Sequence, residues 1–191
     1  MADHQIRYLS RRDVEELGFG MAAVIDAVEE AFREKGLGRA IMPAKHWLAA
    51  SERRFYSAMT SVVPAARAAA CKWQSGSSDN PARGLPYLTG LLVLNDGETG
   101  LPIAVMDSTW ITAVRTAAAT AVTARYLARP DVDAFALLGC GVQGRRHAEA
   151  LRVVYPGLRR IRAYDVDPDA LKRYVREIGD RHGLEVRPCA T

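Results

Sequence analysis

Three glycines in one six-residue segment are the residues whose spacing points most directly to chemistry. The segment reads Gly139, Cys140, Gly141, Val142, Gln143, Gly144. In such a loop the first glycine permits a tight turn, the second lets a pyrophosphate approach the backbone, and the third lets a helix pack closely on a strand. Unpaired N–H groups at the start of that helix attract the phosphates. The loop therefore predicts a dinucleotide site, and the alternative is a tight βα turn without a ligand.

An acidic residue follows the loop at a useful spacing. Asp165 ends the next predicted strand, near the position of a residue that accepts a hydrogen bond from ribose. A carboxylate there accepts from the 2′-OH of NAD and repels the 2′-phosphate of NADP, and Val166 rather than Arg follows it. NAD is therefore the expected cofactor. Asp165 or Asp167 could instead cap the helix that follows.

The segments around the loop have the order of a βαβ unit. The predicted elements are a strand over 132–138, a helix to about 154, a strand over 160–164, a helix over 168–181 and a strand from 185. Pro168 suits the first turn of a helix, and Gly183 suits the position after its end. Residues 129–191 therefore predict the N-terminal half of a Rossmann dinucleotide-binding domain. Since a doubly wound domain has two such halves, we expect this one to be truncated.

The preceding residues predict an α+β domain. Ser10 and Asp13 resemble a capping box, and apolar residues recur at helical spacing over 21–35. Short β-prone segments lie at 54–60, 68–74, 88–95 and 103–106. A hairpin turn from Asn95 to Gly100 joins the last two, so residues 50–107 predict an antiparallel sheet. A connecting helix over 108–128, capped by residues 107–109, completes a domain over 1–128. The fold class is α/β, in which this α+β domain precedes the Rossmann half.

Composition excludes several classes of protein. Lys and Arg are interleaved with Asp and Glu rather than gathered into a basic stripe, which argues against a nucleic-acid partner. No segment has the length and apolarity of a signal peptide or a membrane span. Cys71, Cys140 and Cys189 are far apart and form no metal-binding pair, so we expect no metal. These features predict a cytoplasmic protein.

Several blocks outside the loop resemble one family. They are residues 42–45 (MPAK), 71–73 (CKW) with Asn80 downstream, 94–100 (LNDGETG), 111–118 (ITAVRTAA) and the loop itself. In order and spacing they are similar to the ornithine cyclodeaminase/μ-crystallin family from about residue 10 to the end. The resemblance implies an N-terminal substrate-binding and dimerisation domain beside an NAD-binding Rossmann domain, and a homodimer. It also implies an amino or imino acid substrate that exchanges hydride with nicotinamide.

The resemblance also assigns roles to residues. Lys45 falls on the family's substrate-carboxylate Arg, Lys72 on its substrate Lys, and Arg115 on its second active-site Arg, so Lys72 and Arg115 are the catalytic candidates. Arg115 and Thr116 are further implied to contact the cofactor, with Gly139, Gly141, Val142, Gln143, Gly144 and Asp165. Lys45 keeps the charge of the family's Arg but not its bidentate fork. The family's catalytic Asp would lie beyond position 191.

Each candidate has an alternative that the residues alone leave open. Lys72 would then be a solvated strand residue, and Arg115 a surface residue whose stem covers apolar area. Lys45 would belong to a packing loop with His46 and Trp47. Cys140 fits the loop as a small side chain, since a nucleophile would need a base beside it.

The sequence therefore predicts an NAD-dependent enzyme of the ornithine cyclodeaminase type, or an N-terminal fragment of one. Within the same family the alternatives are a ketimine reductase and an alanine dehydrogenase. A non-catalytic, μ-crystallin-like NAD(P)H-binding protein is the alternative from another class.

Overall fold

The structure is a computed structural model that describes residues 4–190, and it divides into two compact units. Unit 1 comprises Met1–Gly18 and Glu30–Thr112, and unit 2 comprises Phe19–Glu29 and Ala113–Thr191. The division therefore falls inside two helices, α2 (Met21–Gly36) and α3 (Thr109–Leu127). A domain boundary at residue 128 stays a prediction.

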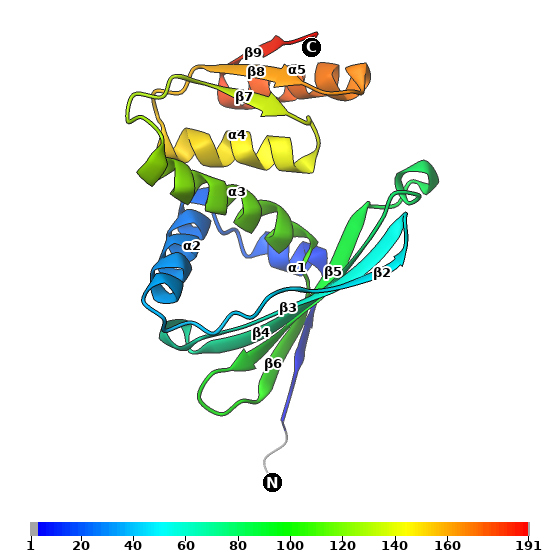
Figure 1. The fold of residues 1–191 in the computed structure, drawn as a ribbon, viewed down its shortest axis with the longest axis vertical. Helices are drawn as coiled ribbons and strands as arrows, with labels where there is room; N and C mark the ends of the chain where they lie inside the picture. The colour runs from blue at the N-terminus through cyan, green and yellow to red at the C-terminus, as the bar shows by residue number, and fades with distance from the viewer. Residues whose placement is uncertain (1–3, 191) are drawn as a thin grey trace. The chain divides into compact units, whose positions relative to one another are not determined.

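Unit 1 is built on a six-stranded sheet (Figure 1). The strands are β1 (Arg7–Leu9), β2 (His46–Ser51), β3 (Arg54–Val63), β4 (Ala68–Ser77), β5 (Leu88–Asp96) and β6 (Pro102–Asp107). Their order across the sheet is β1-β6-β5-β4-β3-β2. All neighbours are antiparallel except β1 and β6, which are parallel. Short 3₁₀ turns, η1 (Pro64–Ala66) and η2 (Pro81–Arg83), follow β3 and β4.

The predicted hairpin between β5 and β6 is confirmed, and side-chain chemistry explains it. Asp96 Oδ1 accepts hydrogen bonds from the backbone N–H of Thr99 at 2.8 Å and from its hydroxyl at 2.7 Å. Asp residues favour turns because their carboxylates bind backbone groups a few positions ahead.

Two strands escaped the sequence prediction. The side chains of β2 are exposed throughout, so no alternation of buried and exposed residues marks it as a strand. The three residues of β1 are too few to show a period, and β1 pairs in parallel with the distant β6. The sheet therefore extends beyond residues 50–107 and is not wholly antiparallel.

The helix α1 (Arg11–Glu16) begins at the predicted capping box. The Ser10 hydroxyl accepts from the Asp13 N–H, and the Asp13 carboxylate accepts from the Ser10 N–H at 2.7 Å. The start of α3 is capped by Asp107, which accepts from the Thr109 N–H at 2.8 Å. The Ser108 hydroxyl is buried and has no partner among the described residues.

Unit 2 carries a three-stranded parallel sheet with the order β7-β8-β9. Its elements after α3 are β7 (Ala134–Leu138), α4 (Val142–Val154), β8 (Arg160–Tyr164), α5 (Pro168–His182) and β9 (Glu185–Pro188). Residues from the strands and both helices form its core, including Ile161, Ala163, Tyr174 and Ile178. This alternation confirms the predicted first half of a dinucleotide-binding fold.

The end signals of α5 are also confirmed. Asp167 caps its start by accepting from the Asp169 N–H at 2.9 Å, and Gly183 ends it in the left-handed conformation at φ +61°. Across residues 4–190, no helix combines the length and apolarity needed to cross a bilayer.

Candidate functional site

Each glycine of the loop has a distinct structural role. Gly139 follows β7 at φ +97°, a backbone conformation in which any residue with a Cβ would be strained. Gly139 therefore makes the turn. Gly141 precedes α4 with open space where a Cβ would lie. At Gly144 a Cβ would lie 2.4 Å from the Gly139 carbonyl oxygen and 3.1 Å from Leu137 Cδ2. Gly144 therefore allows α4 to pack against the loop and β7, while Gly141 leaves its backbone approachable.

The start of α4 is suited to an anion. Arg145 N donates to Gly141 O at 3.2 Å as the first backbone bond, so the preceding N–H groups have no carbonyl within the helix. Gly141 supplies no side-chain cap, and the first turn contains no acidic residue. The positive end of the helix dipole is therefore left for an external acceptor, as a pyrophosphate site requires.

Asp165 lies at the carboxyl end of β8 and contacts the loop. Its Oδ2 accepts from the Cys140 N–H at 2.6 Å, and its Oδ1 accepts from the Asp167 N–H at 2.9 Å. These backbone hydrogen bonds, that from Asp167 first, hold the pKa of the Asp165 carboxyl below its usual range. The carboxylate is therefore charged and beside the glycine loop, where a ribose acceptor is expected.

The Cys140 thiol is unsuited to nucleophilic chemistry. The side chain is fully buried, and burial followed by the charge of Asp165 raises the pKa of the thiol. A thiol that stays protonated is a weak nucleophile. Cys140 therefore fills space, as its small size predicted.

Lys72 is a buried cation in the interior of the unit 1 sheet. It lies on β4, between β3 and β5, with 8% of its surface exposed. Its Nζ donates to the Thr112 hydroxyl at 3.2 Å. The alternative of a solvated strand residue is therefore wrong. A buried ammonium can form strong charge-assisted hydrogen bonds to an anion, which is consistent with a role of Lys72 in binding one.

A row of polar side chains accompanies Lys72, and the sequence reasoning missed it. Gln74 is two residues further along β4, on the face that carries Lys72. It pairs in register with Ser57 on β3 and Gly90 on β5. The Ser57 hydroxyl and Gln74 Oε1 are buried without a hydrogen-bond partner among residues 4–190. The i, i+2 spacing from Lys72 is the sequence signal that could have found Gln74.

Lys45 occupies a different environment. It is exposed, and its Nζ lies 4.5 Å from the centroid of the Trp47 ring. Trp47 in turn stacks on Phe55 with ring centroids 4.0 Å apart. A cation over an exposed aromatic face is stabilised by about 0.5–1 kcal/mol. Lys45 is therefore held by a packed aromatic pair, and its role in binding substrate stays a prediction.

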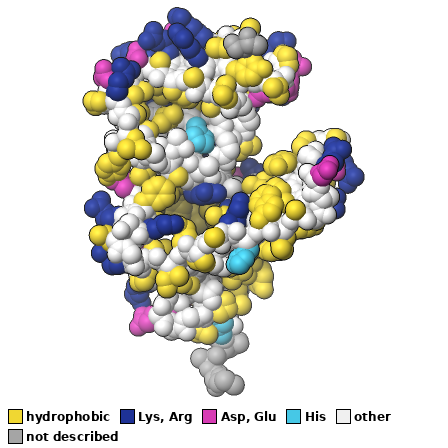
Figure 2. Space-filling view, in the orientation of Figure 1, with side chains coloured by type: hydrophobic (Ala, Val, Ile, Leu, Met, Phe, Trp, Pro, Cys, Tyr) yellow, Lys and Arg dark blue, Asp and Glu magenta, His cyan; other side chains and the backbone are white. Residues whose placement is uncertain are grey.

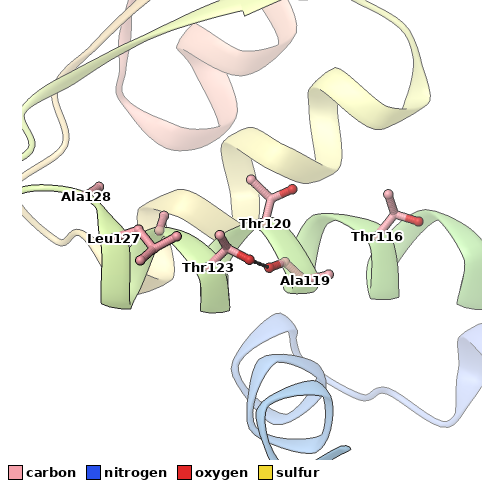
Figure 3. Close-up of a pocket in the computed structure, with 7 residues that line it drawn as sticks. Thr116, Ala119, Thr120, Thr123, Leu127 and Ala128 are labelled. Atoms are coloured by element: carbon pink, nitrogen blue, oxygen red, sulfur yellow. Dashed lines mark hydrogen bonds between the residues drawn. The ribbon is translucent and has the colours of Figure 1, made fainter. Parts of the chain in front are cut away.

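Arg115 and Thr116 lie on the part of α3 that belongs to unit 2. Arg115 is partly buried, and burial lowers the pKa of its guanidinium from the usual value. Thr116 lines an open groove of about 510 Å³ along one side of α3 (Figure 3). Thr120 and Thr123 lie on the same side, and the Thr123 hydroxyl donates to Ala119 O at 2.8 Å. Contacts of Arg115 and Thr116 with a cofactor stay predictions.

His147 links α4 to α3. One ring nitrogen lies 2.7 Å from Gln143 O and the other 3.0 Å from the Thr120 hydroxyl. A carbonyl only accepts, so Nδ1 donates to Gln143, whereas either Nε2 or the Thr120 hydroxyl can be the donor of the second hydrogen bond. Both ring nitrogens of His147 therefore have hydrogen-bond partners, one within α4 and one on α3.

A family model described as the ornithine cyclodeaminase/mu-crystallin family matches residues 5–191. The chain is 41% identical to the nodulation efficiency protein NfeD of Rhizobium meliloti over 167 residues, which are 87% of the chain and 52% of that protein. It is 41% identical to the alanine dehydrogenase of Archaeoglobus fulgidus, over 91% of the chain and 52% of the enzyme. It is 38% identical to the ornithine cyclodeaminase of Agrobacterium fabrum, over 63% of the chain and 33% of the enzyme.

Solved structures agree with this assignment. An archaeal alanine dehydrogenase dimer with bound NAD superposes with a TM-score of 0.89 at 39% identity, covering 96% of this chain and 56% of that one. A Thermococcus litoralis Δ1-pyrroline-2-carboxylate reductase with NADH and L-proline gives 0.91 at 34% identity, covering 96% and 57%. The chain belongs to the ornithine cyclodeaminase/mu-crystallin family, and it spans about half the length of these relatives.

Proposed function

We propose that this chain binds NAD and belongs to an enzyme that exchanges hydride between nicotinamide and a small amino or imino acid. The glycine loop carries the proposal. A Cβ at Gly141 would meet no atom within 4 Å, the start of α4 has no side-chain cap, and Asp165 is charged beside the loop. Relatives solved with NAD or NADH support the same cofactor.

Bound nicotinamide would supply the hydride acceptor or donor. The residues of this chain would bind and orient the other reactant. Lys72 would hold the substrate carboxylate, because a buried ammonium forms strong charge-assisted hydrogen bonds. Arg115 would supply a second cation, and Lys45 a third from the sheet edge. Asp165 would accept from the adenosine ribose.

Amino acid dehydrogenation or imine reduction is favoured by the composition of the sheet face around Lys72. The neighbours of Lys72 in register are Met59 and Leu92, and the next row contains Ser57, Gln74 and Gly90. These five residues include no carboxylate that could neutralise the distal ammonium of ornithine. A substrate whose own side chain is apolar, or polar without a charge, therefore suits this face better than ornithine does.

Ornithine cyclodeamination is the second candidate. The identity to the Agrobacterium fabrum enzyme favours it. The test is turnover by the chain, or by a longer protein that contains it, with NAD and NADH against L-alanine, L-ornithine and cyclic ketimines. Ammonia released from ornithine with proline formed would support cyclodeamination, and NADH-dependent loss of a ketimine would support reduction. NAD binding without any turnover would favour a μ-crystallin-like binding protein. Absence of NAD binding would overturn the dehydrogenase or reductase, the cyclodeaminase and the binding protein alike.

A homodimer is the proposed assembly, through the sheet face opposite Lys72. Large apolar side chains are exposed on that face at Tyr8, Trp73, Leu91 and Ile103, with exposures of 39–76%. The register places them on one side of β1, β4, β5 and β6. Figure 2 shows hydrophobic side chains exposed on unit 1, which contains this sheet. Exposed apolar patches of this kind mark protein interfaces.

Sedimentation velocity tests this assembly. Trp73→Glu should shift the chain from dimer to monomer, because it buries a charge in an apolar interface. Leu37→Glu, at an exposed residue just after α2, is the matched control and should leave the dimer intact. A monomeric unsubstituted chain at all concentrations would refute the assembly.

A further inference from the structure

The peptide groups on either side of Cys140 are both fixed by side chains of unit 2. The Cys140 N–H donates to Asp165 Oδ2 at 2.6 Å. Arg145 Nη1 donates to the Cys140 carbonyl oxygen at 2.5 Å. Two charged side chains therefore hold the middle of the glycine loop, and the one from Arg145 belongs to no motif of the sequence.

Arg145 is itself held in place by α5. Its Nε donates to Glu177 Oε2 at 2.7 Å, and its guanidinium lies 5.9 Å from the centroid of the Tyr174 ring. Tyr174 is fully buried, and its hydroxyl donates to the Gly144 carbonyl at 3.2 Å. The position of the Arg145 fork is therefore set by a buried ring and an ion pair, which limits its freedom to move.

Because the peptide bond is planar, the hydrogen bond from Arg145 to the Cys140 carbonyl also restricts the direction of the Gly141 N–H. The carbonyl of Cys140 and the N–H of Gly141 belong to one trans peptide group, in which they point in opposite directions. A carbonyl held toward Arg145 therefore turns the Gly141 N–H away from Arg145. The loop is also open at Gly141, because a Cβ there would meet nothing within 4 Å.

We propose that Arg145, supported by Glu177, is a positioning residue that aims the Gly141 N–H at the pyrophosphate of the dinucleotide. The proposal rests on NAD binding by the loop and adds the residue that organises it before the cofactor arrives. Preorganised donors bind an anion more tightly because less ordering accompanies binding.

Calorimetric titration of the chain with ADP-ribose tests the proposal. Arg145→Gln should weaken binding about tenfold, the effect of misdirecting one hydrogen bond to a charged group. Arg146→Gln is the matched control, because Arg146 is the next residue of α4, is similarly exposed and pairs with Glu149 at 2.8 Å within the helix. It removes the same charge without touching the loop and should change binding by about twofold or less.

Glu177→Gln separates positioning from simple charge attraction. Removing a negative charge near an anion site would strengthen binding if charge alone mattered. Loss of the Arg145 support should instead weaken it by several fold. Arg145→Lys keeps the charge but lacks a fork that reaches both Cys140 and Glu177, and it should be intermediate.

An amide spectrum supplies an independent readout. The Gly141 resonance should shift on addition of ADP-ribose in the unsubstituted chain and in Arg146→Gln, and should shift much less in Arg145→Gln. Unchanged affinity in Arg145→Gln, or tighter binding in Glu177→Gln, overturns the positioning role of Arg145 but leaves the NAD site standing. Absence of ADP-ribose binding by the unsubstituted chain overturns the NAD site as well.

Discussion

A methyl group at Gly141 should abolish much of the dinucleotide affinity without altering stability. The backbone there has φ −80° and ψ −158°, which alanine adopts without strain. A Cβ would meet no atom within 4 Å. Replacing a glycine N-cap by alanine costs about 0.5–1 kcal/mol of helix stability. Alanine also lowers the conformational entropy of the unfolded chain, which stabilises the folded state by about 0.4–1 kcal/mol. The two effects offset each other, so the net change in unfolding free energy is near zero.

The affinity should change much more, because the methyl group would occupy the open side of the loop. Losing one hydrogen bond to a charged phosphate corresponds to about 1.5–3 kcal/mol, or roughly 10- to 100-fold in the dissociation constant. Calorimetry with ADP-ribose and urea unfolding of the same samples measure both quantities. An affinity for Gly141→Ala within twofold of that of the unsubstituted chain would refute this account of the loop.

The third glycine supplies the opposite control. Gly144→Val would place its Cβ 2.4 Å from the Gly139 carbonyl oxygen. Overpacking of this kind typically lowers the unfolding free energy by about 1–3 kcal/mol. Equal stability of Gly144→Val and the unsubstituted chain would contradict the close packing of α4.

Three further predictions concern other described residues. Asp165→Asn should lower the melting temperature at pH 7, because the pKa of the Asp165 carboxyl is depressed in the folded chain. The contribution of a depressed carboxyl is complete above its unfolded pKa, near 3.8, and is lost as the pH falls below it, so the two melting curves should converge in acid. Tyr174→Phe removes the donor to Gly144 and should cost about 1 kcal/mol in urea unfolding. Lys72→Met should leave unfolding nearly unchanged, since a similar apolar side chain replaces a buried cation. If the proposed function holds, Lys72→Met should also lower the turnover of a carboxylate substrate by roughly 10- to 100-fold, measured on the chain or on a longer protein that contains it.

Each of these has a distinct contrary result. A constant stability difference for Asp165→Asn between pH 7 and pH 3 would show that its charge is irrelevant. An unaltered unfolding curve for Tyr174→Phe would mean that the hydroxyl bond contributes nothing. Full activity of Lys72→Met would remove Lys72 from substrate binding.

Local signals explain why much of unit 2 could be predicted. The ends of β8 and α5 follow from residues that act on their own neighbours, such as Asp167 as the helix cap and Gly183 as the left-handed terminator. The glycine loop was readable for the same reason, since Gly139 and Gly144 are required by backbone conformation and close packing. Strand β1 was not readable, because its pairing with β6 joins residues far apart in the chain.

The sequence by itself determined the glycine loop, the acid that follows it and the lysine on β4. These are properties of residue type and short spacing. Only the tertiary structure decided that Asp165 and Arg145 fix the peptide groups on either side of Cys140, and that Lys72 is buried beside Thr112. Asp165 and Lys72 reach their partners across 25 and 40 residues of chain, and even the nearby Arg145 depends on Glu177, 32 residues on. Such contacts depend on how sheets and helices pack, which no local pattern encodes.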